Sequence, residues 1–325
     1  MSLVKKAVLA AGLVMLAFLL WQLDPAETLA MTLQVGWLFV PILFQELGAH
    51  LFNAWAWRCA FRPEHAASFS LRDLLRYRVM GDGVNYLTPS ATIAGEFARA
   101  SLLSDSQPMA VRVNGVVAAK FAQGLAQVLF ICVGLGWAFG GAVPAVAPYE
   151  SPARAALAVC AVGAVGVWLW PRGRRRVQAG PAAGRPGWRG WVSRLPGDLL
   201  ALLADHPLRS AASVVLFAGG YAWNLGEAWL IARALGVPID LTTALRIEVL
   251  SNVIDALLFM VPAKVGTQEA GKTLVFGLLG LPPRAGLAFG LVRHARELAW
   301  AGLGLGAYAA HERALKALRE TVTPA

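Results

Sequence analysis

Residues 71–103 read LRDLLRYRVMGDGVNYLTPSATIAGEFARASLL. Gly81, Gly83, Pro89 and Gly95 interrupt this otherwise helical, largely apolar pattern. Proline breaks a helix because it lacks the backbone N–H and clashes with the preceding turn. The stretch is therefore not expected to form one straight spanning helix, and we expect a broken hairpin that turns at Pro89.

A second stretch, residues 241–281, is broken in the same way at Pro262 and Gly266. A single shift of 173 residues relates the two stretches, since it superimposes five pairs: Asp82 with Asp255, Pro89 with Pro262, Glu96 with Glu269, Arg99 with Lys272, and Lys120 with Arg293. Such a coincidence indicates an internal repeat. We expect repeat one at about residues 1–138 and repeat two at about 153–310.

The composition places these stretches in a membrane protein. Of the 325 residues 57% are hydrophobic and only 15% are charged, against roughly a quarter charged in a soluble domain. Apolar runs near 20 residues long predict an all-α membrane bundle in a single domain. The expected spanning helices are residues 7–23, 33–57, 111–137, 153–170, 210–232 and 285–309. The net charge of +10 concentrates in connections rather than on one basic face, so nucleic-acid binding is not expected.

Orientation follows from Lys and Arg, which accumulate in cytoplasmic connections. Lys5 and Lys6 place the N-terminus inside, and the connection 171–209 is rich in arginine. Residues 140–152 contain neither Lys nor Arg and are expected outside. With six crossings both termini are cytoplasmic, and with re-entrant hairpins the second repeat is inverted. If the hairpins instead span fully, the repeats are parallel.

Each hairpin carries an acid and a base three residues apart, Glu96 with Arg99 and Glu269 with Lys272, which places each pair on one helix face. A charge at the bilayer centre costs roughly 2.5 to 3.5 kcal/mol, so these groups must face one another, a cavity or a ligand. A buried ion-pair lattice that only holds the hairpins together is the alternative.

Further polar residues lie within predicted helices. They are Glu46, His50 and Asn53 in the second helix, Asn224 and Glu227 in the fifth, and His294, Arg296 and Glu297 in the last. Only five histidines are present and none has HExxH spacing, so no metal or cofactor is expected.

Three segments resemble a known family: YRVMGDGVNYLTPSATIAGEFARASLL (77–103), VPAKVGTQEAGKTLVFGLLGLPP (261–283) and LVRHAREL (291–298). They are similar to the membrane domain of lysylphosphatidylglycerol synthases, the flippase-like proteins, and closest to the hopanoid-biosynthesis-associated branch. The resemblance implies movement of amphiphilic lipids between leaflets, or support of the synthesis or export of hopanoids or related lipids.

Residue by residue, the resemblance carries over Asn85, Pro89, Gly95, Glu96 and Arg99 in the first motif, and Pro262, Gly266, Gln268, Glu269, Arg293, Arg296 and Glu297 in the second. Two positions depart from the family pattern. Ala94 stands where a second glycine is expected, and Lys120 stands where related proteins often carry an acid. The soluble aminoacyl-transferase domain of the bifunctional synthases is expected to be absent, since the sequence ends soon after the last predicted helix.

The leading hypothesis is a lipid translocator in the inner membrane, with a lipid as substrate and no catalytic residues. Its substrate-binding residues are Asn85, Glu96, Arg99, Lys120, Gln268, Glu269, Lys272, Arg293, Arg296 and Glu297, and its hairpin-forming residues are Pro89, Gly95, Pro262 and Gly266. One alternative is an intramembrane lipid-modifying enzyme that uses Glu96, Glu269 or His294 as acid and base. Another is a scaffold for lipid-biosynthetic membrane proteins.

Overall fold

The computed structural model describes residues 3–87, 93–103, 106–169, 205–257 and 264–322. All regular secondary structure within these ranges is helical, which confirms the predicted all-α class. Pro89, Pro262 and most of the basic connection 171–209 lie outside the described residues, so their predicted roles stay predictions.

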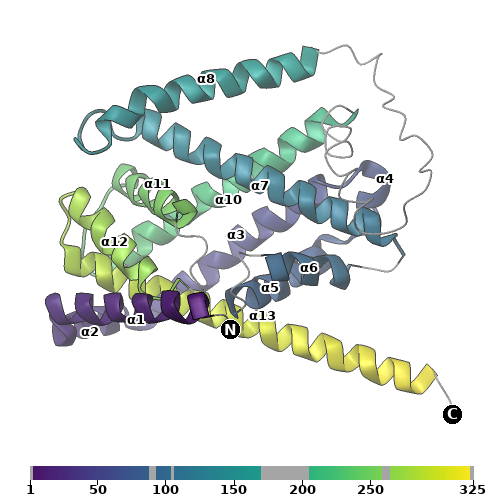
Figure 1. The fold of residues 1–325 in the computed structure, drawn as a ribbon, viewed down its shortest axis with the longest axis horizontal. Coiled ribbons are helices and arrows are strands. Elements are labelled where there is room, and N and C mark those ends of the chain that lie inside the picture. The colour runs from purple at the N-terminus through teal and green to yellow at the C-terminus, as the bar shows by residue number, and fades with distance from the viewer. Residues whose placement is uncertain (1–2, 88–92, 104–105, 170–204, 258–263, 323–325) are drawn as a thin grey trace. The chain divides into compact units, whose positions relative to one another are not determined.

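The helices follow one another along the chain (Figure 1). They are α1 (Leu3–Gln22), α2 (Pro25–Gln34), the 3-10 turn η1 (Gly36–Leu38), α3 (Phe39–Cys59), α4 (Pro63–Ala66), α5 (Leu71–Leu87), α6 (Ile93–Leu102), α7 (Met109–Trp137), α8 (Ala147–Leu169), α10 (Pro207–Ala234), α11 (Leu241–Leu257), α12 (Thr267–Leu278) and α13 (Pro283–Val322).

Contacts between Cα atoms divide the chain into two compact units. Unit 1 comprises Met1–Leu47, Leu75–Leu102 and Gly226–Ala325, and unit 2 comprises Gly48–Leu74 and Leu103–Leu225. The boundaries fall within α3, α5 and α10. Each unit is therefore assembled from segments that are far apart in the sequence.

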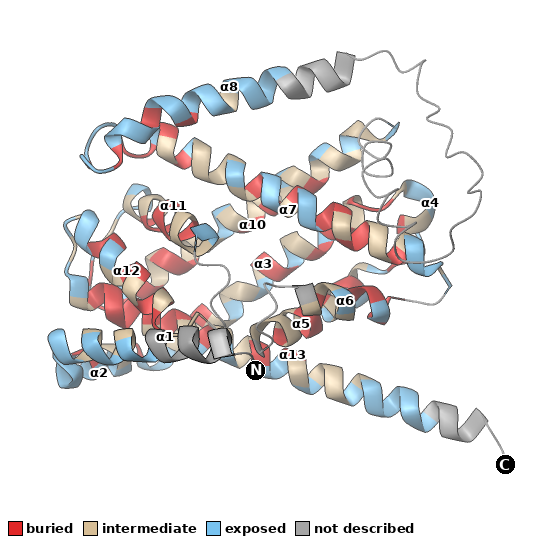
Figure 2. Cartoon of the chain, viewed as in Figure 1, coloured by how far each residue is buried: buried red, intermediate tan, exposed pale blue. Residues whose placement is uncertain are grey.

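In unit 1, α12 packs along α13, and α2 packs against α13 as well. Buried residues concentrate where α12 and α13 meet, whereas α2 and the C-terminal part of α13 are largely exposed (Figure 2). Gly83 and Gly304 let α5 cross α13 closely, since a Cβ atom at Gly83 would lie 2.8 Å from the carbonyl oxygen of Ala301 and a Cβ atom at Gly304 would overlap the carbonyl oxygen of Val79.

In unit 2, α7 packs against α8, and the start of α10 is fastened to the end of α3. Arg209 donates from Nη2 to the carbonyl oxygen of Arg58 at 2.9 Å and from Nε to that of Phe61 at 3.1 Å. Ser213 donates to the carbonyl oxygen of Ala56 at 2.8 Å. Basic side chains commonly satisfy the last carbonyls of a helix in this way.

Helices flank both predicted breaks. The first hairpin has α5 ending at Leu87 and α6 beginning at Ile93, and the second has α11 ending at Leu257 and α12 beginning at Thr267. Adding 173 to the bounds of α5 gives 244–260, against 241–257 for α11, and adding it to those of α6 gives 266–275, against 267–278 for α12. The helix bounds thus follow the repeat shift to within a few residues.

Two expected boundaries are wrong. The stretch 24–32, expected as a connection, contains α2, because Asp24 accepts hydrogen bonds from the backbone of Ala26 and Glu27 and Pro25 occupies the first helical turn. The last helix, expected to end at 309, continues to Val322. Residues 310–322 contain neither Gly nor Pro, so nothing in their sequence stops the helix.

By length and composition, one helix within the described ranges qualifies by itself as a membrane span, namely α7, with a mean hydropathy of 1.8. The helices Leu13–Gln22 and Pro25–Gln34 qualify only together and meet at an angle of 95°. The other predicted spans coincide with long helices, but those helices do not meet this criterion. The number of six crossings therefore stays a prediction.

Candidate functional site

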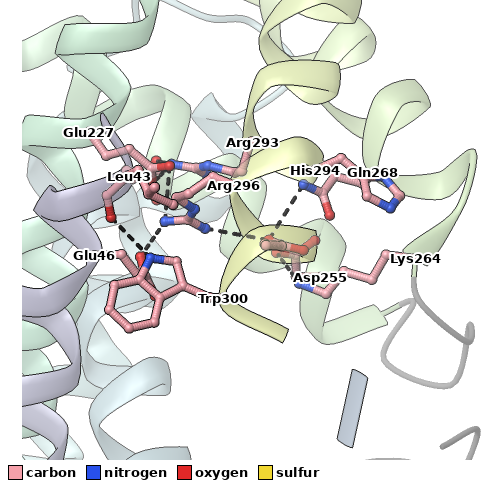
Figure 3. A network of polar contacts seen from close by, with 12 residues as sticks. Leu43, Glu46, Glu227, Asp255, Lys264, Gln268, Arg293, His294, Arg296 and Trp300 are labelled. Atoms are coloured by element: carbon pink, nitrogen blue, oxygen red, sulfur yellow. Dashed lines mark hydrogen bonds and ion pairs between the residues drawn. The ribbon is translucent and has the colours of Figure 1, made fainter. Parts of the chain in front are cut away.

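Arg293 and Arg296 lie on one face of α13 and form ion pairs with carboxylates of other helices of unit 1 (Figure 3). Glu227 of α10 contacts both, with its Oε2 at 2.8 Å from Nη2 of Arg293 and its Oε1 at 2.9 Å from Nη1 of Arg296. Glu248 of α11 lies 2.5 Å from Nη2 of Arg293. Glu46 of α3 pairs with Nη1 of Arg296. Two arginines thus connect α3, α10 and α11 to α13.

Glu297 is the most loosely held carboxylate near these arginines. Its Oε1 lies 3.6 Å from Nη2 of Arg296 and 3.5 Å from Nε2 of Gln268 on α12. Both distances exceed the 2.7 to 3.2 Å range of ordinary N–H···O hydrogen bonds.

Glu269 both caps a helix and contacts a polar side chain. Its Oε2 accepts a hydrogen bond from the backbone N–H of Gly266 at 2.9 Å, so the carboxylate caps the start of α12. Its Oε1 lies 2.6 Å from Nδ1 of His294. Gly266 has a φ of 75°, a conformation that glycine adopts without strain.

Two lysines complete the charged set. Lys264 Nζ lies 3.5 Å from Oδ2 of Asp255. Lys272 on α12 is 1% exposed and interacts electrostatically with Asp255, Arg293 and Glu248. The side chains that contact or interact with this face of α13 are called the α13 network below: Glu46, Glu227, Glu248, Asp255, Lys264, Gln268, Glu269, Lys272, Arg293, His294, Arg296 and Glu297.

A second cluster forms around Arg99 in the first hairpin. Arg99 Nη1 lies 2.8 Å from both carboxylate oxygens of Glu96, and Nη2 pairs with Asp82 of α5. Arg78 lies 3.8 Å from the other oxygen of Asp82. Two acids and two arginines therefore balance one another, and this set is called the Arg99 cluster below.

The glycines of the first hairpin make room for the Arg99 cluster. Asn85 Oδ1 accepts a hydrogen bond from the backbone N–H of Gly95 at 2.6 Å, which joins α5 to α6. A Cβ atom at Gly95 would overlap the carbonyl oxygen of Gly81 and the side chain of Asn85, and one at Gly81 would lie 2.6 Å from Cγ of Arg99. The close packing of α5 on α6 requires glycine at positions 81 and 95. Alanine at position 94, where the family pattern has a second glycine, therefore does not disturb this packing.

Tyr86 connects the two sets of charges. It follows Asn85 on α5, and its ring meets the His294 ring edge-on with centroids 6.2 Å apart. His294 in turn contacts Glu269. Tyr86 thus joins α5 to α13 by an aromatic contact, in addition to the ion pair of Glu46 with Arg296 between α3 and α13. Glu96 and Glu269 each bind other partners.

The structure sorts the predicted residues into three groups. Glu96, Arg99 and Asn85 gather in the first hairpin, and Gln268, Glu269, Lys272, Arg293, Arg296 and Glu297 gather in the α13 network. Lys120 is exposed on α7 and belongs to unit 2. The expected pairing of Glu269 with Lys272 is wrong, because the carboxylate is taken up by Gly266 and His294.

Sequence reasoning did not select Glu248 or Lys264. Glu248 stands in the run ALRIEVL of residues 244–250, where Arg246 is the other charged residue, and is 2% exposed. A lone acid in such a run was the available signal, because an intramembrane charge requires a partner. Lys264 gave no comparable signal, since it lies between Pro262 and Gly266, where a solvated turn is the ordinary interpretation.

Large apolar side chains are exposed on several helices, including Phe18 of α1, Phe44 of α3, Val133 of α7 and Leu303 of α13. Such exposed apolar side chains suit contact with lipid or with a partner protein. Residues 4–306 match the family described as the lysylphosphatidylglycerol synthase TM region, and the chain belongs to this family. It is therefore a membrane protein with a lipid-related function. Comparisons with curated proteins and with solved structures gave no match.

Proposed function

We propose that this protein translocates a lipid or amphiphile, of the hopanoid, phospholipid or glycolipid class, between the leaflets of the inner membrane. The observation that carries the proposal is the burial of charged side chains inside a protein that exposes large apolar side chains on several helices. Arg99, Lys272 and Arg293 are 4%, 1% and 6% exposed, respectively. Apolar side chains would join helices at lower cost than buried charges do, so charges at this depth favour a polar cargo.

A lipid headgroup that leaves water needs polar partners along its path. In the Arg99 cluster the guanidinium pairs with Glu96 and Asp82. An anionic or zwitterionic headgroup can replace one carboxylate at Arg99, and the released carboxylate is then neutralised by a proton or by the cationic part of a zwitterionic headgroup. We assign Arg99 and Lys272 as the cationic partners of the headgroup. Localisation in the inner membrane and association with lipid-biosynthetic membrane proteins belong to the same proposal.

Reconstituted vesicles test this function. The purified protein should exchange a fluorescently labelled phospholipid between leaflets, and mass spectrometry should find the lipid unchanged. Glu96→Gln combined with Arg99→Gln removes both charges of the pair and should keep the protein folded while exchange is lost. Arg72→Gln, an exposed position at the start of α5, is the matched control and should exchange normally. A folded double variant with normal exchange would contradict the assignment of Arg99.

One observation favours a second candidate, an intramembrane lipid-modifying enzyme. His294 and Glu269 lie 2.6 Å apart, a distance suited to proton transfer between a general acid and a general base. Against this stands the capping of α12 by the same carboxylate. A change in the mass of the incubated lipid, abolished by His294→Gln, would favour the enzyme over the translocator.

A further inference from the structure

Two buried hydrogen-bonding atoms near α13 have no hydrogen-bond partner among the described residues. They are Oε1 of Gln268 on α12 and the hydroxyl oxygen of Tyr86 on α5. Gln268 is only 3% exposed. A buried polar atom without a partner has lost its hydration and gained no hydrogen bond in return, which is unfavourable and uncommon in folded proteins. Two such atoms therefore need a physical explanation, and a ligand that supplies the hydrogen bonds is one.

The two side chains approach the same face of α13 from different helices. His294 and Glu297 are three residues apart on α13, so they share that face. The ring of Tyr86 meets the ring of His294 edge-on, with centroids 6.2 Å apart. Nε2 of Gln268 lies 3.5 Å from Oε1 of Glu297. Tyr86 and Gln268 thus lie at positions one helical turn apart on α13, and they are called the Tyr86–Gln268 pair below.

The chemistry of the pair selects its ligand. The amide nitrogen of Gln268 faces the Glu297 carboxylate, since the reverse orientation would set an oxygen against an oxygen. Oε1 of Gln268 is therefore an acceptor in need of a donor. The hydroxyl of Tyr86 can both donate and accept. A hydroxyl group of a ligand matches both side chains, because it also donates and accepts.

An ammonium group is a poorer match than a hydroxyl group. Amide and phenol are uncharged, so they cannot neutralise a cation. Glu297, the carboxylate beside Gln268, already interacts electrostatically with Lys264, Arg293 and Arg296. A further cation at this place would be repelled by these three, and the repulsion is stronger in a protein interior than in water. A hydroxyl group adds no charge.

The pair also lies near the cation that the proposed function assigns to the headgroup. Tyr86 and Asp82 are four residues apart on α5, which places them on one helix face about 6 Å apart along the axis. Asp82 pairs with Nη2 of Arg99. A glycerol or inositol headgroup carries its hydroxyl groups within a few bonds of the lipid phosphate. One headgroup can therefore present its phosphate to Arg99 and its hydroxyl groups to Tyr86.

We infer that Tyr86 and Gln268 form a subsite for the hydroxyl groups of a polyol headgroup, and that they select hydroxyl-bearing lipids from other lipids of equal charge. The inference rests on the proposed translocation and adds the headgroup chemistry that the site recognises. A headgroup hydroxyl donates to Oε1 of Gln268, and the hydroxyl of Tyr86 donates to a headgroup oxygen. No covalent bond changes.

Lipid retention by the purified full chain in detergent, measured by native mass spectrometry, tests the subsite without reference to transport. The probes are phosphatidylglycerol, phosphatidylinositol and phosphatidylpropanol, which carry equal charge, and the last has no headgroup hydroxyl. The wild type should retain at least one of the two polyol lipids about tenfold more strongly than phosphatidylpropanol, because the latter leaves buried polar atoms unpaired. Preference for phosphatidylglycerol indicates an open-chain polyol, and preference for phosphatidylinositol indicates a ring.

The double variant Tyr86→Phe with Gln268→Met should bring this retention ratio close to one. Tyr86→Phe keeps the ring against His294, and Gln268→Met keeps the length of the side chain, so the protein should stay folded. Tyr149→Phe with Gln22→Met makes the same chemical changes at exposed positions and should keep the wild-type ratio. Equal retention of the three lipids by the wild type, or a preference that survives in the double variant, overturns the inference. Stronger retention of phosphatidylethanolamine than of both polyol lipids assigns the pair to an ammonium group and overturns it as well.

Exchange in reconstituted vesicles separates this inference from the proposed function, with the same lipids labelled on an acyl chain. The wild type should exchange the preferred polyol lipid severalfold faster than phosphatidylpropanol, and the double variant should exchange both at one rate. Equal rates in the wild type overturn the selection of hydroxyl groups but leave translocation standing. If the wild type exchanges neither lipid, the proposed translocation fails, and the retention ratios decide the subsite.

Discussion

At Arg293 a single guanidinium nitrogen faces two carboxylates, Glu227 at 2.8 Å and Glu248 at 2.5 Å. Both acids are almost fully buried, at 0% and 2% exposure. Neither acid can be hydrated when the arginine is removed, so the contact stabilises the fold mainly by avoiding the burial of unpaired charge.

Replacement of Arg293 should therefore lower the free energy of unfolding strongly. Arg293→Gln leaves Glu248 without the cation that contacts it, with Lys272 as its remaining electrostatic partner, and leaves Glu227 with Arg296 alone. We expect a loss of about 3 to 5 kcal/mol in the free energy of unfolding, the usual effect of removing one partner of a buried pair. Unfolding in mixed detergent micelles measures it. Arg313→Gln, exposed on the same helix, should change it by less than about 0.5 kcal/mol, and equal effects would contradict the network.

Among the helices, the crossing of α5 and α13 depends on two glycines that face each other. The carbonyl oxygen of Val79 approaches Gly304, and the backbone of Ala301 and Leu305 approaches Gly83. Small residues allow helices in membranes to approach closely, because van der Waals contact replaces the hydrophobic effect as the attraction between them.

A methyl group at this crossing should push the helices apart. Gly304→Ala is expected to destabilise by about 1 to 3 kcal/mol, since overpacking forces the backbone to shift. Gly302 and Gly306 lie on the same helix, and a Cβ atom at either would meet nothing within 4 Å. Gly302→Ala and Gly306→Ala should therefore be neutral or stabilise by up to about 1 kcal/mol through helix propensity. Thermal unfolding of the three variants in one detergent separates the two outcomes.

The start of α11 should respond to pH. Asp240 lies in the exposed connection before α11, and hydrogen bonds from the side chain and backbone N–H of Thr243 lower the pKa of its carboxyl group. A lowered pKa means that the cap contributes stability above the ordinary pKa of aspartate and loses it as the pH falls through the folded value. Hydrogen exchange at the Thr243 amide should accelerate over that interval. Asp240→Asn keeps an acceptor that does not titrate and should remove the dependence.

The parts of the fold that sequence predicted are those governed by strong local signals. Apolar runs predicted the long helices, and the helices that flank residues 88–92 and 258–263 end and begin close to the two expected hairpin breaks. The region of Asp24 was mispredicted because a capping side chain outweighed the expectation of a connection. The site was predicted in composition but only partly in pairing. The pair Glu96–Arg99 follows from i,i+3 spacing within one helix. The contact of Glu269 with His294 joins two helices, so spacing along one helix could not predict it.

For the whole molecule, the distribution of Lys and Arg fixes the expected orientation. Lys5 and Lys6 precede the first helix, Arg313, Lys316 and Arg319 lie near the end of the last, and residues 140–152 lack both residue types. The positive ends should stay in the cytoplasm.

Reporter fusions test this topology. A reporter active only in the cytoplasm should be active at the N-terminus and after Arg319, and inactive when inserted at Gly141. Substituting Arg at positions 140 and 142 is the control that should weaken the outward placement of that connection. Activity at Gly141 together with inactivity at both termini would invert the proposed orientation, and unlike termini would exclude an even number of crossings.

The 40-residue length of α13 has a mechanical consequence. At 1.5 Å per residue the helix is about 60 Å long, twice the roughly 30 Å of the hydrocarbon layer. The segment from Glu297 to Val322 alone extends over about 38 Å. A rigid helix of that length is a lever whose short arm carries the buried charges, so a tilt of only about 5° displaces its far tip by about 3 Å. A spin label or fluorophore near residue 317 would then register such a tilt as a movement large enough to measure.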